Sequence, residues 1–305
     1  MIRRGIRRAT TAHRAAAGCG LAVALALLSG MGQAARAQAG ADLNISPKRV
    51  VFSADMRSAM VYVFNRGGQP ATYNISLTDR IMTPDGQVRA VTDPEVTAGA
   101  ADVVARLQSA QPLLTYTPRR VTLQPGQSQV VRIRAQRPAE PGAAEYHTHL
   151  TVTTVPPESA GVTAEEAASA APGQVVARVN TLFSISIAVI VRQGPTDVQA
   201  GLDGAKYLPR ASGQPGGAGV LSVDLLRKGA NSIYGDVEVR EAKASKSAPP
   251  LGAIRGVAVY TEVDRRNVQI PLSRVPRPGE VLEITLKDDD IKPGAVLATA
   301  AFTVP

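Results

Sequence analysis

Apolar side chains recur at every second position between Val175 and Val191, and this pattern constrains the fold more than any other feature of the chain. Only Thr181 interrupts the apolar parity. The other parity is mixed: it carries the polar residues Arg178, Asn180, Ser184 and Ser186, together with Val176, Leu182, Ala188 and Ile190. A period of two predicts a β-strand with one buried face. The apolar parity consists of Val175, Ala177, Val179, Phe183, Ile185, Ile187, Val189 and Val191.

The length of this segment predicts more than a structural role. Strands usually run about 5–6 residues, so residues 175–191 exceed what one sandwich needs. A strand with spare apolar side chains and free backbone groups either promotes aggregation or pairs with another chain. We interpret the segment as a platform for pairing. The alternative is an ordinary strand buried between two sheets, with the extra residues in a loop.

The first 37 residues have the layout of a secretory signal peptide. A cluster of arginines precedes an apolar run at residues 21–28, which is too short to span a bilayer, and possible cleavage sites follow at Ala37 and Ala39. Removing this segment with its six arginines reduces the net charge from +9 to +3. The basic composition therefore gives no reason to expect a nucleic-acid partner. We expect the mature protein in an exported compartment.

The mature chain is expected to have neither a disulfide nor a membrane anchor. Its single cysteine, Cys19, lies in the signal segment before the apolar run, where a lipid-modified cysteine would follow that run. The mature protein must therefore be stabilised by its core alone. No later segment reaches about 18 consecutive apolar residues, which predicts no stable membrane insertion.

Short strands separated by turn residues fill the rest of the chain and predict an all-β fold. We expect one domain at residues 40–192 and a second at residues 196–305, with a break at Gln193-Gly194-Pro195. Before the long strand, the first domain should contain strands at residues 44–52, 58–65, 71–80, 113–117, 128–135 and 145–154. The second should contain strands at residues 219–227, 235–241, 256–262, 281–286 and 295–304.

Two insertions interrupt the first domain. Residues 94–111 place Val103, Val104 and Leu107 at helical spacing, which predicts a short helix packed on the rim of the sandwich. Residues 158–173 are rich in Ala, Glu, Ser and Pro and predict a mobile loop that leads into the long strand.

Several blocks of this sequence together resemble the PapD-like periplasmic chaperones of the chaperone–usher pilus pathway. Ser46-Pro47-Lys48-Arg49-Val50-Val51-Phe52 is similar to that family's first strand with its arginine, and residues 61–65 are similar to its second strand. The long strand falls where the family's G1 strand is expected. Further blocks match in order and spacing: Tyr116-Thr117-Pro118, Val121-Thr122-Leu123-Gln124-Pro125-Gly126-Gln127-Ser128, Val131-Arg132-Ile133, and Glu145-Tyr146 through to Val155-Pro156-Pro157.

The resemblance implies two immunoglobulin-like β-sandwich domains set at an angle, and a periplasmic chaperone without cofactors. Its partners would be pilus or fimbrial subunits that lack their last strand. The chaperone lends its G1 strand to the open groove of the subunit (donor-strand complementation), prevents aggregation, and delivers the subunit to an outer-membrane usher. The candidate subunit-binding residues are Arg49, Val175, Ala177, Val179, Phe183, Ile185, Ile187 and Arg192.

The resemblance also implies an anchor for the subunit's terminal carboxylate, formed in the family by two basic residues in the cleft between the domains. Arg49 matches the first of them. The second is a lysine four residues before the arginine matched by Arg192, and this position is Ala188 here, which cannot bind a carboxylate. Three alternatives follow: Arg49 acts alone, a nearby basic residue such as Arg192 takes over, or the chaperone serves a divergent system.

The remaining polar motifs favour no catalytic or metal site. His147 and His149 lie on the parity opposite Leu150, so we expect them to be exposed and not to bind metal. Asp288-Asp289-Asp290 lacks the spacing of a calcium loop and is expected to be a solvated turn. No nucleophile motif is present, so we expect no enzyme. The second functional hypothesis is an immunoglobulin-like structural or adhesive module of a surface fibre, but only residues 39–43 precede the first strand, too few for a donor extension.

Overall fold

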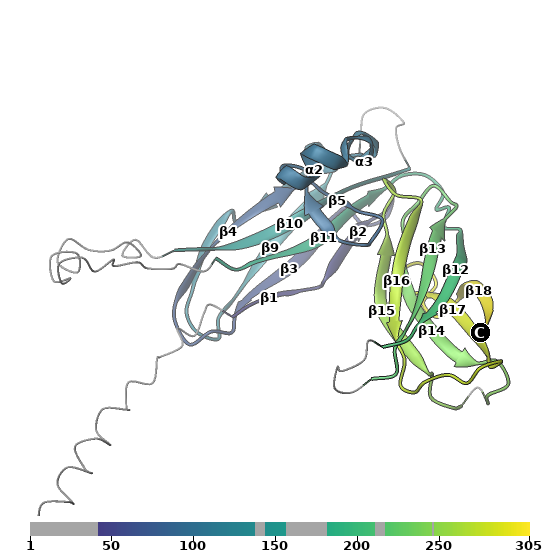
Figure 1. Ribbon diagram of the computed structural model, residues 1–305. Helices are drawn as coiled ribbons and strands as arrows, with labels where there is room; N and C mark the ends of the chain where they lie inside the picture. The colour runs from purple at the N-terminus through teal and green to yellow at the C-terminus, as the bar shows by residue number, and fades with distance from the viewer. Residues whose placement is uncertain (1–41, 138–143, 157–181, 211–216, 246) are drawn as a thin grey trace, which may run out of the picture. The chain divides into compact units, whose positions relative to one another are not determined.

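The computed structural model describes residues 42–137, 144–156, 182–210, 217–245 and 247–305. These residues are almost entirely strands and turns, which confirms the all-β prediction (Figure 1). All of them belong to one compact unit, Ala41–Pro305. The predicted signal peptide, the predicted loop at residues 158–173, and the candidates Val175, Ala177 and Val179 lie outside the described ranges.

Two sheets with their own apolar core form what we call the first sandwich. One sheet has the order β1-β3-β9-β7, with bounds Leu43–Ser46, Ser58–Asn65, Ser128–Ala135 and Leu114–Thr117. The other has the order β2-β11-β10-β4-β8, with bounds Arg49–Phe52, Ser184–Arg192, Glu145–Val155, Ala71–Thr78 and Arg120–Leu123.

Alternation along the strands builds the core of the first sandwich. In β3, Val61 and Val63 are fully buried, whereas Met60 and Tyr62 on the opposite parity are exposed. Burying each such aliphatic side chain contributes about 1.5–3 kcal/mol relative to leaving it in water. The core also takes side chains from β10 and β11, namely Leu150, Val152, Ile187, Val189 and Val191.

Pro47 explains why the strand predicted at residues 44–52 is two strands. Proline has no N–H to donate to a ladder and is confined to interruptions and edges of sheets. β1 ends at Ser46 and pairs antiparallel with β3, while β2 begins at Arg49 and pairs parallel with β11 in the other sheet. The chain therefore crosses between the sheets at Pro47, and this crossing places Arg49 beside β11.

The second sandwich, as we call the sheets of β12 to β18, has its own core of Val, Ile and Leu side chains. β12 (Ala200–Leu208), β13 (Val220–Arg227) and β16 (Arg265–Pro271) form one sheet. The other has the order β15-β14-β17-β18, with bounds Gly252–Val259, Ile233–Glu241, Val281–Asp288 and Val296–Thr303. Met82 and Ala188 of the first part of the chain also belong to this core, so the apolar packing continues between the two sandwiches.

The segment between β4 and β7 also contacts the second sandwich. It contains the hairpin of β5 (Arg80–Met82) and β6 (Val88–Ala90), then α2 (Pro94–Gly99), α3 (Ala101–Arg106) and the 3₁₀ turn η1 (Gln111–Leu113). Helical structure is confirmed in this insertion, but as two short helices that end at Arg106, and Val103 packs against the second sandwich and not on the rim of the first. Arg106 donates two hydrogen bonds to Asp264, at 3.1 and 2.9 Å.

Within the described ranges, no helix has both the length and the apolar character needed to cross a bilayer. The domain limits near residues 192 and 196 and the angle between the domains stay predictions.

Candidate functional site

One edge of β11 is only half covered. β10 pairs with β11 along its whole length, but β2 pairs only with residues 188–191. β1 pairs with β3 in the other sheet, so among the described residues no strand pairs with Ser184–Ile187 on the β2 side. The structure thus leaves a four-residue stretch of strand edge open for backbone pairing.

The register identifies the backbone groups that face this open edge. The N–H of Thr154 donates to the carbonyl of Phe183 at 2.9 Å, so residue 183 and every second residue after it turn their backbone groups toward β10. The alternate residues, Ser184 and Ser186, therefore direct their N–H and C=O groups toward the open edge. Farther along the same parity, Ala188 and Ile190 face β2.

The side chains of the predicted apolar parity differ in how exposed they are along β11. Ile187 is 3 % exposed and belongs to the core of the first sandwich, so it is not free to fill a partner's groove, contrary to our expectation. Ile185 packs partly against the same core. Phe183 is 45 % exposed while its backbone is fixed to Thr154, so of these three it alone presents its side chain outward.

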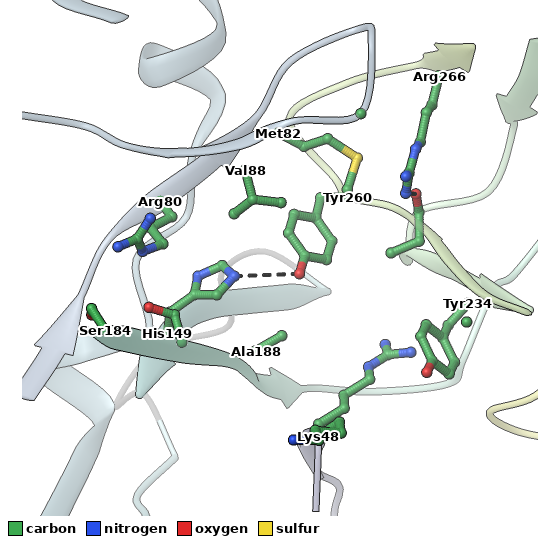
Figure 2. Close-up of a pocket in the computed structure, with 15 residues that line it drawn as sticks. Lys48, Arg80, Met82, Val88, His149, Ser184, Ala188, Tyr234, Tyr260 and Arg266 are labelled. Atoms are coloured by element: carbon green, nitrogen blue, oxygen red, sulfur yellow. Dashed lines mark hydrogen bonds between the residues drawn. The ribbon is translucent and has the colours of Figure 1, made fainter. Parts of the chain in front are cut away.

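A pocket of about 490 Å³ lies next to this edge, between strands of the two sandwiches (Figure 2). Ser184, Ser186 and Ala188 of β11 line one side of it. Tyr234 and Tyr260 come from the second sandwich. None of the residues that line the pocket is acidic. Four cationic side chains complete the lining, namely Lys48, Arg49, Arg80 and Arg266.

Arg49 is held in this pocket by three contacts. Its Nη2 atom lies 3.2 Å from Asp290 Oδ2 and 3.4 Å from Ser232 Oγ, and the guanidinium lies 4.5 Å from the centre of the Tyr234 ring. Its Nε and Nη1 atoms are buried without a hydrogen-bond partner among the described residues. Desolvation lowers the pKa of Arg49, although Asp290 opposes this effect. Arg49 therefore retains donors for a further anion.

Asp290 also pairs with Arg192, which corrects the prediction of a solvated Asp288–Asp290 turn. Asp288 is buried and accepts hydrogen bonds from the backbone N–H groups of Asp290, Ile291 and Lys292, which fixes the turn. The Oδ2 atom of Asp290 then lies 2.7 Å from Arg192 Nη2. Asp290 thus neutralises two buried arginines, Arg49 and Arg192, and the spacing of the sequence does not indicate these distant partners.

Arg192 is a buried link between the sandwiches. Its Nε donates to Glu145 Oε2 at 2.9 Å, and the same oxygen accepts a hydrogen bond from the N–H of Ser232 at 3.2 Å. Burial alone would lower the pKa of Arg192, but Glu145 and Asp290 together raise it. Arg192 does not line the pocket, and its guanidinium is engaged by these two carboxylates.

The two histidines are buried, which contradicts the expectation that they are exposed. Their parity was assigned correctly, opposite Leu150, but residues of the second sandwich cover that face. His147 Nε2 lies 2.9 Å from Glu262 Oε2, and His149 Nε2 shares a hydrogen bond of 3.3 Å with the hydroxyl of Tyr260 (Figure 2). Within the described residues, no group of three or more metal-ligating side chains is assembled.

His149 should make stability depend on pH. Burial, together with the charges of His147 and Arg80, lowers the pKa of His149 from 6.5 to about 3. Between these values the unfolded chain binds a proton on this side chain and the folded protein does not, so its contribution is complete above pH 6.5 and is lost as the pH falls toward 3. The loss is about 1.4 kcal/mol per pH unit.

A His149→Asn variant tests this dependence by urea unfolding. Between pH 6.5 and about pH 4.5, the natural protein should lose about 2 kcal/mol more stability than the variant. Equal losses in the two proteins would show that His149 is protonated in the folded state, contrary to our expectation.

No protein-family model and no curated protein matches the chain. Among solved structures, the chain is similar to the Pseudomonas aeruginosa CupB2 chaperone, with a TM-score of 0.41 and 14 % identity over 86 % of this chain and 100 % of that one. It is also similar to the E. coli chaperone DraB, with a TM-score of 0.40 and 14 % identity over 87 % and 97 % of the two chains.

A third similar structure is that of the Salmonella enterica SafA pilin in complex with the SafB chaperone, with a TM-score of 0.38 and 13 % identity over 87 % of this chain and 97 % of that one. At these TM-scores, the function has to be inferred from the chain's own residues.

Proposed function

We propose that this protein is a periplasmic chaperone for incomplete pilus or fimbrial subunits. It pairs the open edge of β11 with a subunit that lacks its last strand, covers the exposed groove, and passes the subunit to an outer-membrane usher. The observation that carries this proposal is an open strand edge that runs directly into an arginine-lined pocket. The edge supplies backbone pairing and the pocket supplies a fixed end point for the bound strand.

The exposed side chains at the start of β11 support the same function. Leu182 and Phe183 are 55 % and 45 % exposed, at the end of the open edge farthest from the pocket's Arg49. An apolar groove in a partner would bury Phe183, and such burial contributes about 1.5–3 kcal/mol. In the sequence, the same parity continues before it, after the interruption at Thr181, with Val179, Ala177 and Val175.

Isolation of the mature protein with its bound partner tests the proposal. We expect mass spectrometry of the material purified from the periplasm to identify an immunoglobulin-like subunit without its last strand. A fibre module would instead be recovered from sheared surface fibres. Recovery from sheared fibres, with no subunit bound in the periplasm, would contradict the proposed function.

Arg49→Gln should weaken binding of that subunit about tenfold or more, because a charge-assisted hydrogen bond to a carboxylate contributes about 1.5–3 kcal/mol. The fold should persist, since Asp290 keeps Arg192 as its partner. Arg134→Gln is the matched control, because Arg134 is exposed on β9 in the other sheet. Affinities can be measured by titration calorimetry with the purified subunit. An equal affinity of Arg49→Gln and Arg134→Gln would exclude Arg49 as the anchor.

A further inference from the structure

The pocket carries more positive charge than one carboxylate would neutralise. Arg49 and Arg192 are already balanced by Glu145 and Asp290, two carboxylates for two guanidinium groups. Three other cationic side chains line the pocket, namely Lys48, Arg80 and Arg266. None of these three has an acidic partner within 4 Å among the described residues.

Two of these three cations have buried donors without a partner. The Nε atoms of Arg80 and Arg266 make no hydrogen bond within the described part of the chain. The Nη1 of Arg266 donates to the carbonyl of Ala258 at 2.7 Å, and Lys48 donates to Asn44 at 2.7 Å, so both have neutral partners. A buried cationic donor left unsatisfied costs the free energy of its desolvation, which an anion in the pocket would offset.

The cations lie at different places around the pocket. In Figure 2, Arg80 lies beside His149, Lys48 lies near Ala188, and Arg266 lies on the far side of Tyr260 from His149. Ala188 pairs with Arg49 of β2 on one side and with His149 of β10 on the other. A single anionic group at Arg49 therefore leaves Arg80, on the β10 side of the pocket, uncompensated.

The open edge of β11 runs along one side of the pocket. Ser184 and Ala188 are four residues apart, which is about 13 Å along a strand. Arg80 follows β4, on the β10 side of β11, so a partner strand on the open edge lies across β11 from Arg80, with the small side chains of Ser184, Ser186 and Ala188 lining the pocket between them. A long acidic side chain directed into the pocket from the last few residues of that strand would extend over β11 toward the free Nε of Arg80.

We propose that the pocket recognises two carboxylates on one strand: the terminal carboxylate at Arg49, and an acidic side chain, within about the last four residues, at Arg80. This inference rests on the proposed function and adds a sequence requirement for the partner. It also assigns to Arg80 part of the role left open at Ala188. Arg80 comes from β5, far from β11 in the sequence, and reaches the site only through the fold.

Acetylated pentapeptides with a free C-terminus provide the probe. In one series a glutamate occupies the second, third or fourth position from the end, and in the matched series a glutamine does. Binding is followed by NMR of the arginine Nε–H groups. At one position at least, glutamate should bind about tenfold more tightly than glutamine, since each new charged hydrogen bond contributes about that factor.

Arg80→Gln should remove this preference for glutamate, and it should weaken binding of the glutamine peptide much less than Arg49→Gln does. Arg80→Lys, which keeps the charge, should retain part of the preference. Arg49→Gln should weaken binding of every free-acid peptide, and Arg134→Gln should change nothing. Retention of the natural fold by Arg80→Gln is checked by the unaffected resonances of the second sandwich.

The outcomes separate this inference from the proposed function. If the glutamine peptide binds through Arg49 but glutamate gives no advantage at any position, the second carboxylate site does not exist while the chaperone proposal stands. If neither peptide binds, both proposals fail. If Arg80→Gln still prefers the glutamate peptide, the assignment to Arg80 is overturned. If inorganic phosphate binds more strongly than any of the peptides, the assignment to two separate carboxylates is overturned.

Discussion

Phe183→Glu should abolish capture of an incomplete subunit while the protein stays folded. Phe183 is 45 % exposed, so the substitution costs little in the free protein. In the complex it would place a charge in an apolar groove without a partner, which is strongly unfavourable. We expect no subunit to be recovered with the variant when the two proteins are expressed together in the periplasm.

Leu182→Glu is the matched control for this experiment. Leu182 is adjacent, is 55 % exposed, and belongs to the opposite parity of the strand. Because it would not face the same groove, subunit recovery should stay close to that of the natural protein. Equal recovery with the two variants, whether high or low, would show that the parity of residue 183 does not direct binding.

Arg192→Met should cost about 3–5 kcal/mol of stability, because it leaves a buried carboxylate without its partner. The side chain of Glu145 is fully buried and that of Arg192 is 7 % exposed. The neighbouring Asp290 would keep only Arg49. Urea unfolding at neutral pH measures the loss.

Arg265→Met supplies the comparison for Arg192. Arg265 also contacts two carboxylates, Asp224 and Asp203, but its side chain is 57 % exposed. Exposed pairs of this kind contribute about 0–1 kcal/mol. If Arg192→Met destabilises the protein no more than Arg265→Met does, the buried link between the sandwiches is not a source of stability.

Local patterns predicted most strands of the first sandwich, although β8 was not predicted. The bounds of β3 and β9 agree with the prediction, because each strand alternates cleanly between core and solvent and ends at a turn. The split at Pro47 follows from the missing N–H of proline and was predictable in principle. β12 and β16 were not predicted. Gly201 and Gly204 interrupt the pattern of β12, which contains an irregular register, and β16 begins with polar residues.

The candidate site was only partly predictable, because its residues come together through contacts between the sandwiches. The motif around Arg49 identified one residue of the pocket. Nothing near Arg80 or Arg266 in the sequence indicates that these side chains line the same pocket. The burial of His149 was missed for the same reason: alternation assigns a face of the strand, but not whether another sheet covers that face.

Amide hydrogen exchange along β11 tests the central claim most directly. In the free protein, the amides of Ser184 and Ser186 should exchange rapidly because they face the open edge, whereas that of Ile190 should be protected by β2. Binding of a subunit should slow exchange at Ser184 and Ser186 by about tenfold or more. Slow exchange at these two amides in the free protein, or unchanged exchange in the complex, would contradict pairing through this edge.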